Sequence, residues 1–330
     1  MAQAVSPFSD EQLRALINLR PRYEALIEAE RGLAKLPYNV VRKSIAGREY
    51  LYEAVDRANN GNSLGPMSPE LERKFDDYHA AKRDLKSRRA IAQGLIAEIG
   101  RIARPYRLPM LSSEAGELLR ELDRRGLLDG ALMVVGTNCL PAYSLEAGGT
   151  IADAPDETED FDIAWVAERD SEASALWAAL KAVDPTFTVN SERQFQARNA
   201  KTYEVELLVA PSRQATMHPR EQPRPVPLPE QEWLLPGRRV DQVVPCRDGT
   251  AARLVVPDPR WFALHKLWLA DQPKRNPLKR GKDRKQGLAL LDAVADAMPH
   301  YPLDDAFVTE LPEELMPLFE QWRDQSRMSQ

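Results

Sequence analysis

The chain has 330 residues and a formal net charge of −5, and 29% of its residues are charged. This balance is ordinary for a soluble globular protein of two or three domains, and it argues against general coating of nucleic acid. Two cysteines are too few for a disulfide framework or a zinc site, so a reducing cytoplasm is the expected setting. No signal peptide is recognisable and no stretch is apolar enough to span a bilayer, so we expect no membrane association.

The first predicted element is a helix over residues 9–35, in which apolar residues recur at helical spacing. Residues 38–65 change to a β-type pattern around a glycine turn, which predicts a hairpin. A second helix is predicted over residues 68–104, because serine followed by proline is typical of a helix start. The two helices are expected to pair antiparallel with the β unit at their tip, as a region that covers residues 1–110.

The predicted β unit carries basic and aromatic side chains together. They are Arg42, Lys43, Arg48, Tyr50 and Tyr52. A solvated hairpin packed on a helix is the plainer interpretation. The alternative is a grip on a nucleic-acid acceptor, because aromatic rings and cations together bind single strands.

A third predicted helix over residues 113–126 leads to a buried strand near residues 131–135, which breaks at Gly136 and Thr137. Phosphate suits such a turn, because backbone N–H groups can approach it closely where there is no side chain. A plain turn at the end of a strand is the alternative.

Asp160 and Asp162 lie two residues apart in a strand-like segment, so their carboxylates share one face. Two adjacent carboxylates repel each other unless a cation sits between them, and oxygen ligands suit Mg²⁺ or Mn²⁺. A later strand over residues 203–209 places Glu204 and Glu206 on one face, where a third carboxylate would complete a two-metal site. We choose Glu206, because the more apolar half of the strand flanks it. A solvated strand edge and a surface glutamate are the alternatives.

The remaining predicted elements follow in order: a helix over 171–183, a short strand over 187–189, a proline-rich loop over 219–236, a hairpin between 242 and 256, a helix from Asp258, a helix that ends near Met298, and a helical stretch over 304–326. Seven of the twelve residues from 274 to 285 are basic and include Lys282, which could bind an anion or form a solvated face. Lys266 is either a phosphate ligand or a lysine that extends from an apolar helix to solvent.

Together these residues resemble the nucleotidyltransferase superfamily typified by DNA polymerase beta. More closely, the chain resembles the bacterial nucleotidyltransferase-fold proteins related to abortive-infection toxins. The superfamily pattern is a strand, a glycine followed by glycine or serine, a helix, an Asp-x-Asp or Asp-x-Glu strand and a later acid. Residues 136–137, Asp160-Phe161-Asp162 and Glu206 match it. The resemblance covers about residues 130–295.

The chain departs from this pattern in three places. Thr137 stands where serine is usual, which keeps the hydroxyl group, and the third acid is a glutamate, which reaches further than an aspartate. The spacing between Gly136 and Asp160 is longer than in the minimal pattern, so residues 148–157 are expected to form an inserted loop.

The resemblance implies an α/β fold with a nucleotidyltransferase-type mixed sheet in a catalytic domain over residues 111–256. A C-terminal helical part over residues 257–330 would complete the nucleotide site. The implied reaction moves a nucleoside monophosphate from a nucleoside triphosphate to a hydroxyl acceptor, for which RNA or tRNA is one candidate. Asp160, Asp162 and Glu206 would be catalytic and bind the metal. The nucleotide would be bound by Gly136, Thr137, Lys266 and Lys282.

Two other functions stay open at this point. One is an inactive nucleotidyltransferase fold that only binds a partner, although the intact set of three acids argues against it. The other is a toxin-like enzyme that attaches AMP to a protein side chain and is controlled by an antitoxin-like partner.

Overall fold

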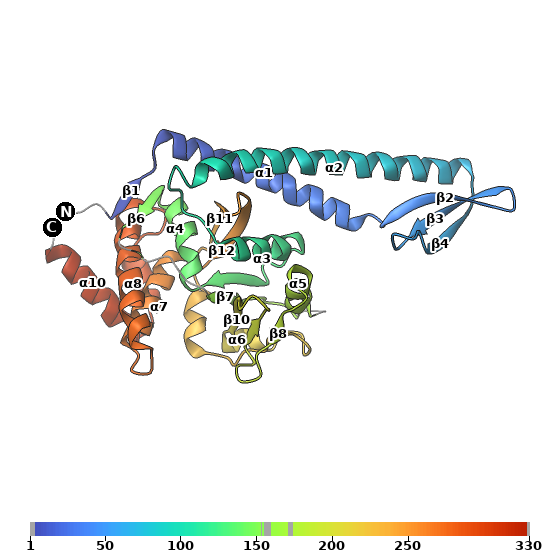
Figure 1. Ribbon diagram of the computed structural model, residues 1–330. Coiled ribbons are helices and arrows are strands. Elements are labelled where there is room, and N and C mark those ends of the chain that lie inside the picture. The colour runs from blue at the N-terminus through green and yellow to red at the C-terminus, as the bar shows by residue number, and fades with distance from the viewer. Residues whose placement is uncertain (1–3, 153, 155–159, 171–173, 329–330) are drawn as a thin grey trace. The chain divides into compact units, whose positions relative to one another are not determined.

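The computed structural model describes residues 4–152, 154, 160–170 and 174–328. The chain folds into two compact units (Figure 1). Unit 2 comprises Pro21–Glu98, and the remainder of the described chain forms unit 1. Within the described ranges, no helix is long and apolar enough to cross a membrane.

Unit 2 contains two long helices, α1 (Asp10–Lys35) and α2 (Pro69–Ala103), of which α1 begins and α2 ends in unit 1. Arg22 donates from Nη1 to the carbonyl oxygen of Leu95 at 2.9 Å, and Arg88 pairs with Glu28 at 3.0 Å. Residue numbers therefore rise along α1 in the direction in which they fall along α2. The two helices run antiparallel, and the predicted helix pair is confirmed.

The sheet of unit 2 has the order β2 (Asn39–Ile45), β3 (Arg48–Ala54) and β4 (Gly61–Pro66), and all neighbours are antiparallel. The predicted hairpin is present, but the third strand was not expected because its sequence, Gly-Asn-Ser, is typical of a turn. Gly61 allows the strand to pair closely with β3, since a Cβ at this position would collide with the backbone of Glu53.

The central sheet of unit 1 has the order β5 (Leu132–Val135), β7 (Asp160–Trp165), β10 (Glu204–Val209), β9 (Gln196–Arg198) and β8 (Thr188–Val189). β7 and β10 are parallel, and every other pair of neighbours is antiparallel. The predicted mixed α/β sheet is confirmed. Alternation along β7 and β10 buries Phe161, Ile163, Val205 and Leu207 completely and leaves the acidic residues on the other face.

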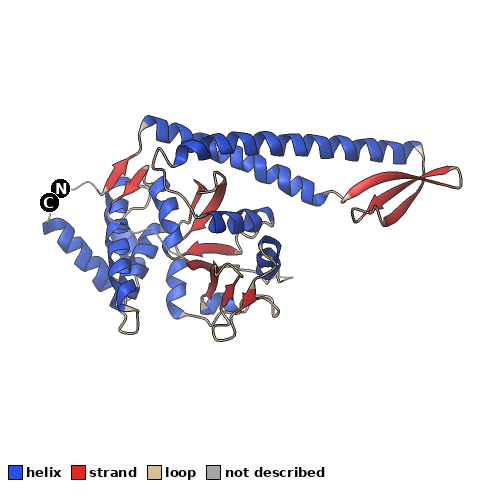
Figure 2. Ribbon diagram, viewed as in Figure 1, coloured by secondary structure: helices blue, strands red, loops and turns tan. Residues whose placement is uncertain are grey.

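Helices and two small strand pairs surround this sheet (Figure 2). The helical elements are α3 (Ser113–Arg124), η1 (Thr137–Cys139), α4 (Leu140–Glu146), α5 (Ala175–Val183), α6 (Pro211–Gln214), η2 (Pro229–Leu234), α7 (Pro259–Asp271), α8 (Pro277–Ala297), α9 (Asp305–Glu310) and α10 (Met316–Met328). The strand pairs are β1 (Val5–Pro7) with β6 (Gly149–Ile151), and β11 (Val240–Pro245) with β12 (Ala251–Val256).

The hydrophobic core of unit 1 continues across residue 256, the end of the predicted catalytic domain. Val256 of β12, Phe262 of α7 and Leu290 of α8 all belong to one buried cluster. Asp258 caps α7 as expected, since its side chain accepts a hydrogen bond from the backbone N–H of Arg260. Residues 111–256 and the C-terminal helices therefore share one core.

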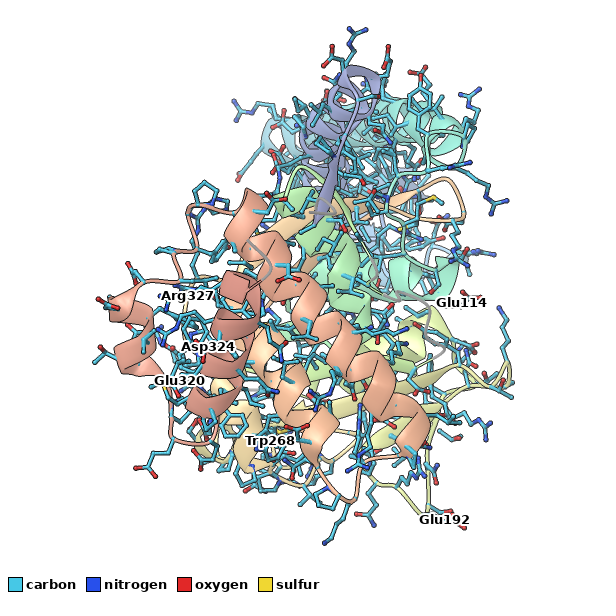
Figure 3. The ribbon with its side chains drawn as sticks, turned by 90° about the vertical axis from the view of Figure 1, so that its left-hand side faces the viewer. Glu114, Glu192, Trp268, Glu320, Asp324 and Arg327 are labelled. Carbon is cyan, nitrogen blue, oxygen red and sulfur yellow. The ribbon has the colours of Figure 1, made fainter. Side chains whose placement is uncertain are left out.

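The last helix, α10, has one buried and one exposed face. Phe319 and Trp322 are buried, and the indole N–H of Trp322 donates to Asp292 of α8 at 2.7 Å. The side chains of Glu320, Asp324 and Arg327 lie on the exposed face, as Figure 3 shows along α10. Apolar burial and one hydrogen bond thus attach α10 to α8.

Four local features need correction or completion. The predicted loop over 148–157 begins with strand β6, which pairs with the distant β1, while residues 153 and 155–157 lie outside the described residues. Strand β9 was not expected, because three residues, two of them polar, give little pattern. The basic run over 274–285 belongs mostly to the start of α8. Residues 171–173 of the predicted 171–183 helix also lie outside the described residues, and the rest contains α5.

Candidate active site

Four acidic residues meet at the start of β7 and β10. In the parallel register, Asp160 lies opposite Glu204, and Asp162 lies opposite Glu206. Because side chains alternate along a strand, all four carboxylates share one face of the sheet. The structure therefore brings together the three acids that the sequence analysis selected.

Gly136 lies directly against Asp162. The residue before it, Val135, is the cross-strand partner of Asp162, and a Cβ on Gly136 would overlap the Asp162 carboxylate. Gly136 also has a φ of +74°, a conformation that favours glycine. Two independent constraints thus require glycine at this turn.

The turn continues into the short helix η1, which is tied to its surroundings by side chains. Thr137 is buried, and its Oγ1 accepts a hydrogen bond from Nε2 of Gln286 of α8 at 3.3 Å. Asn138 donates from Nδ2 to the carbonyl oxygen of Asp160 at 3.0 Å. The Gly136–Thr137 turn is therefore held in place by both β7 and α8.

Burial and neighbouring negative charge raise the pKa of two carboxyl groups of this site, those of Asp162 and Glu206. Burial raises the pKa of Asp162 to about 7, and the charge of Glu206 adds to the effect. The pKa of Glu206 is raised too, first by burial and then by Asp160. The site therefore brings carboxyl groups together in a partly buried environment, where their ionised form is unfavourable.

One lysine of the basic run reaches the acids. Lys279, in the first turn of α8, places Nζ 3.3 Å from Oδ2 of Asp160. The sequence analysis singled out Lys282 from the same run, and that residue lies one helical turn further on and is half-buried. The sequence gives no signal that separates the two lysines, because the orientation of α8 decides which one faces β7.

Lys266 is a buried member of a charged cluster. Its Nζ lies 2.9 Å from Oδ1 of Asp283, and Nη2 of Arg275 lies 2.7 Å from Oδ2 of the same carboxylate. Lys266 is still near enough to lower the pKa of Asp162. The adjacent His265 is buried, and burial lowers its pKa to about 3, so the imidazole is neutral and serves in packing.

Gln196 on β9 is a site residue that the sequence analysis missed. Its Nε2 donates to Oε2 of Glu204 and to Oε1 of Glu206, both at 3.0 Å. Its Oε1 accepts from Nδ2 of Asn190 at 2.7 Å, which fixes the orientation of the amide. Gln196 is almost completely buried, yet nothing in its local sequence marks it, because its role comes from pairing with β10.

The oxygen donors of the site suit a hard divalent cation. Among the described residues, no group of three or more His, Cys, Asp or Glu side chains stands arranged to hold a metal ion. Lys279 is the present partner of Asp160, and Gln196 is that of Glu206. Two carboxylates nevertheless share one strand face, and a third lies on the neighbouring strand. A bound Mg²⁺ would relieve the electrostatic repulsion between them.

A family model described as "Nucleotidyltransferase" matches residues 113–312, more than half of the chain and the whole of the candidate site. No curated protein matches the chain. One similar solved structure is an antigenic nucleotidyltransferase-like protein from Paracoccidioides brasiliensis. It is 17% identical over 66% of this chain and 92% of that chain, with a TM-score of 0.35.

Proposed function

The chain belongs to the nucleotidyltransferase family, and on this premise we propose that it moves a nucleoside monophosphate from a nucleoside triphosphate to a hydroxyl acceptor. The observation that carries the proposal is the in-register placement of Asp160, Asp162 and Glu206 on one sheet face. The turn at Gly136 lies directly beside these acids.

The position of each acid in the site suggests its role in the proposed reaction. Asp160 and Asp162 would hold Mg²⁺ or Mn²⁺, which when bound neutralises the triphosphate and activates the acceptor hydroxyl. Glu206 lies opposite Asp162 and has a raised pKa, so it suits the role of proton acceptor. The acceptor oxygen forms a bond to the α-phosphorus, pyrophosphate leaves, and the hydroxyl proton passes to Glu206.

The turn and the cations would hold the triphosphate. Backbone N–H groups at Gly136 and Thr137 suit the terminal phosphates. The side chain of Lys279 is exposed, and it could turn from Asp160 to a phosphate once a metal neutralises that carboxylate. Lys266 would contribute charge from its buried position, and Lys282 would add to the positive field of α8.

Metal binding is the first test of this proposal. We expect the wild-type protein to bind Mn²⁺ in isothermal titration calorimetry, and the Asp160→Ala, Asp162→Ala double variant to show no binding. The double variant should still fold, because the removal of paired carboxylates relieves repulsion. Equal Mn²⁺ affinity of the two proteins would disprove the metal site.

Catalysis is tested by incubating the protein with each labelled nucleoside triphosphate, total RNA and Mg²⁺. We expect one triphosphate to label an acceptor with the wild-type protein, and none to do so with the double variant. If no triphosphate gives transfer, with RNA or with a cell extract as the acceptor, the inactive binding function is favoured instead.

Glu206 and Glu204 provide a matched pair for the role of the third acid. Both accept a hydrogen bond from the same Gln196 amide, so a change to glutamine removes the same charge and disturbs the same contact, although Glu204 also pairs with Nε of Arg198 at 3.3 Å. Only Glu206 lies opposite Asp162. We expect Glu206→Gln to lower kcat by about 10²–10⁴-fold with little change in triphosphate affinity, and Glu204→Gln to have a small effect. A larger loss for Glu204→Gln would reverse the assignment.

A further inference from the structure

The three-stranded sheet of unit 2 has one face packed on α2 and one face that this packing does not use. Val40 and Leu51 are buried together with Tyr78 of α2. Arg42 points to the same side, because its guanidinium lies 4.4 Å from the ring centre of Phe75 and pairs with Glu72. These residues define the helix-facing side of the sheet.

The residues between them point to the opposite side, which we call the open face. Its cross-strand pairs are Val41 with Tyr52, Lys43 with Tyr50, and Ile45 with Arg48. The ammonium group of Lys43 lies over the ring of Tyr52, 4.5 Å from its centre, and donates a hydrogen bond to the carbonyl oxygen of Asn59 at 2.7 Å, so a ligand that uses this lysine or this ring must displace it. Both tyrosines are half-buried, and Ile45 is 47% exposed. Aromatic rings and cations thus alternate over a solvent-accessible surface.

The acidic residues of β2 and β3 lie on the helix-facing side of this sheet together with Arg42, and Asp56 of the loop after β3 lies near Lys43 of the other side. Glu49 lies opposite Ser44 and Glu53 lies opposite Val40, so both acids belong to the helix-facing side. Lys43 and Arg48 belong to the open face. Basic residues also outnumber acidic ones in unit 2, whereas the whole chain has a net charge of −5. A polyanion is therefore the complementary partner of the open face.

We propose that the open face binds single-stranded nucleic acid, with two bases stacked on Tyr50 and Tyr52 and the phosphates near Lys43 and Arg48. The two tyrosines are two residues apart on one strand, about 7 Å, a distance that one step of an extended nucleic-acid strand can span. Stacking on aromatic rings requires exposed bases, which a duplex does not offer. The inference deepens the proposed function, on which it rests, by naming single-stranded nucleic acid as the class of acceptor.

Binding is measured by fluorescence anisotropy with labelled 12-nucleotide oligo(U) and oligo(A), without nucleoside triphosphate or divalent cation. We expect the wild-type protein to bind both single strands and to bind a duplex of the same length at least tenfold more weakly. The Tyr50→Ala, Tyr52→Ala double variant should lose at least tenfold in affinity for the single strands, whereas Tyr50→Phe, Tyr52→Phe should retain it, because phenylalanine keeps the stacking surface.

Charge is tested separately from stacking. Arg48→Gln should weaken binding. It should also reduce the slope of log affinity against log salt concentration by about one, the amount expected for the loss of one phosphate contact. The matched control is Arg83→Gln with Lys86→Gln, which neutralises two exposed cations of α2 and should have a smaller effect. Equal losses from the control and from the open-face variants would show general attraction to α2 and overturn the proposal.

Thermal unfolding followed by circular dichroism establishes that the alanine variant is folded. The proposal fails if that folded variant binds single strands as the wild type does, or if the wild type binds none. A protein would then be the remaining candidate partner of the open face. The Asp160→Ala, Asp162→Ala variant should bind the oligonucleotides normally. Binding without transfer would therefore defeat the proposed function and leave the open face as a binding surface for single strands, whereas transfer without binding at the open face would defeat this inference alone.

Discussion

Replacement of Asp162 by asparagine is expected to abolish nucleotidyl transfer and yet to stabilise the folded protein above pH 7. Burial and the charge of Glu206 raise the pKa of Asp162 from 3.8 to about 7. Between these values the folded state holds a proton that the unfolded state has lost, so stability falls as the pH rises through this window. The cost is complete above pH 7 and amounts to at most about 4 kcal/mol, since each pKa unit corresponds to about 1.4 kcal/mol. Asparagine carries no charge and avoids this cost.

Urea unfolding of both proteins at pH 5 and pH 8, without divalent cations, measures this effect. The stabilisation by Asp162→Asn should be larger at pH 8 than at pH 5, and Mg²⁺ should stabilise only the wild type. Asp160→Asn is the control, because it removes a carboxylate that pairs with Lys279 and should not stabilise. The same difference in unfolding free energy at both pH values would contradict the expectation.

Substitution of Gly136 by alanine should cost both stability and activity. The added Cβ would overlap the carboxylate of Asp162, and the backbone of Gly136, with φ +74° and ψ −161°, lies in a region essentially restricted to glycine, which costs alanine about 1–3 kcal/mol. The overlap must displace Asp162 or the turn, so metal binding and triphosphate binding should be lost together with turnover.

Gly148 provides the matched control for this variant. It has a similar φ of +67°, but a Cβ there would meet nothing within 4 Å. Gly148→Ala should therefore show only the backbone cost in thermal unfolding, and it should keep metal binding and activity. If the two variants lose activity equally, the collision with Asp162 is not the cause.

The acids and the turn could be selected from the sequence because their signals are local. Period-two alternation in Asp160-Phe161-Asp162 and around Glu206 shows which side chains share a face, whatever the neighbours are. The glycine after an apolar run marks the end of β5 in the same way. The long helices α1 and α2 were predicted within a residue or two for the same reason, since apolar spacing, capping residues and prolines act within a few residues.

The short strands β6 and β9 were missed because each depends on a partner, whereas β4 was missed because its sequence is typical of a turn. β6 exists through its pairing with β1, which lies more than a hundred residues earlier, and β9 exists through its pairing with β10. A segment of three residues cannot form a strand by its own propensity, so its composition carries almost no information.

The sequence by itself determined the fold class, the long elements and the three acids, because alternation and turn chemistry are properties of neighbouring residues. Only the tertiary structure decided that Asp162 faces Glu206, that Gln196 bridges the two glutamates, and that Lys279 is the lysine at Asp160. It also decided that Lys266 is buried against Asp283. These contacts join residues from different elements, and the register of β7 with β10 and the orientation of α8 set them through packing that no local pattern encodes.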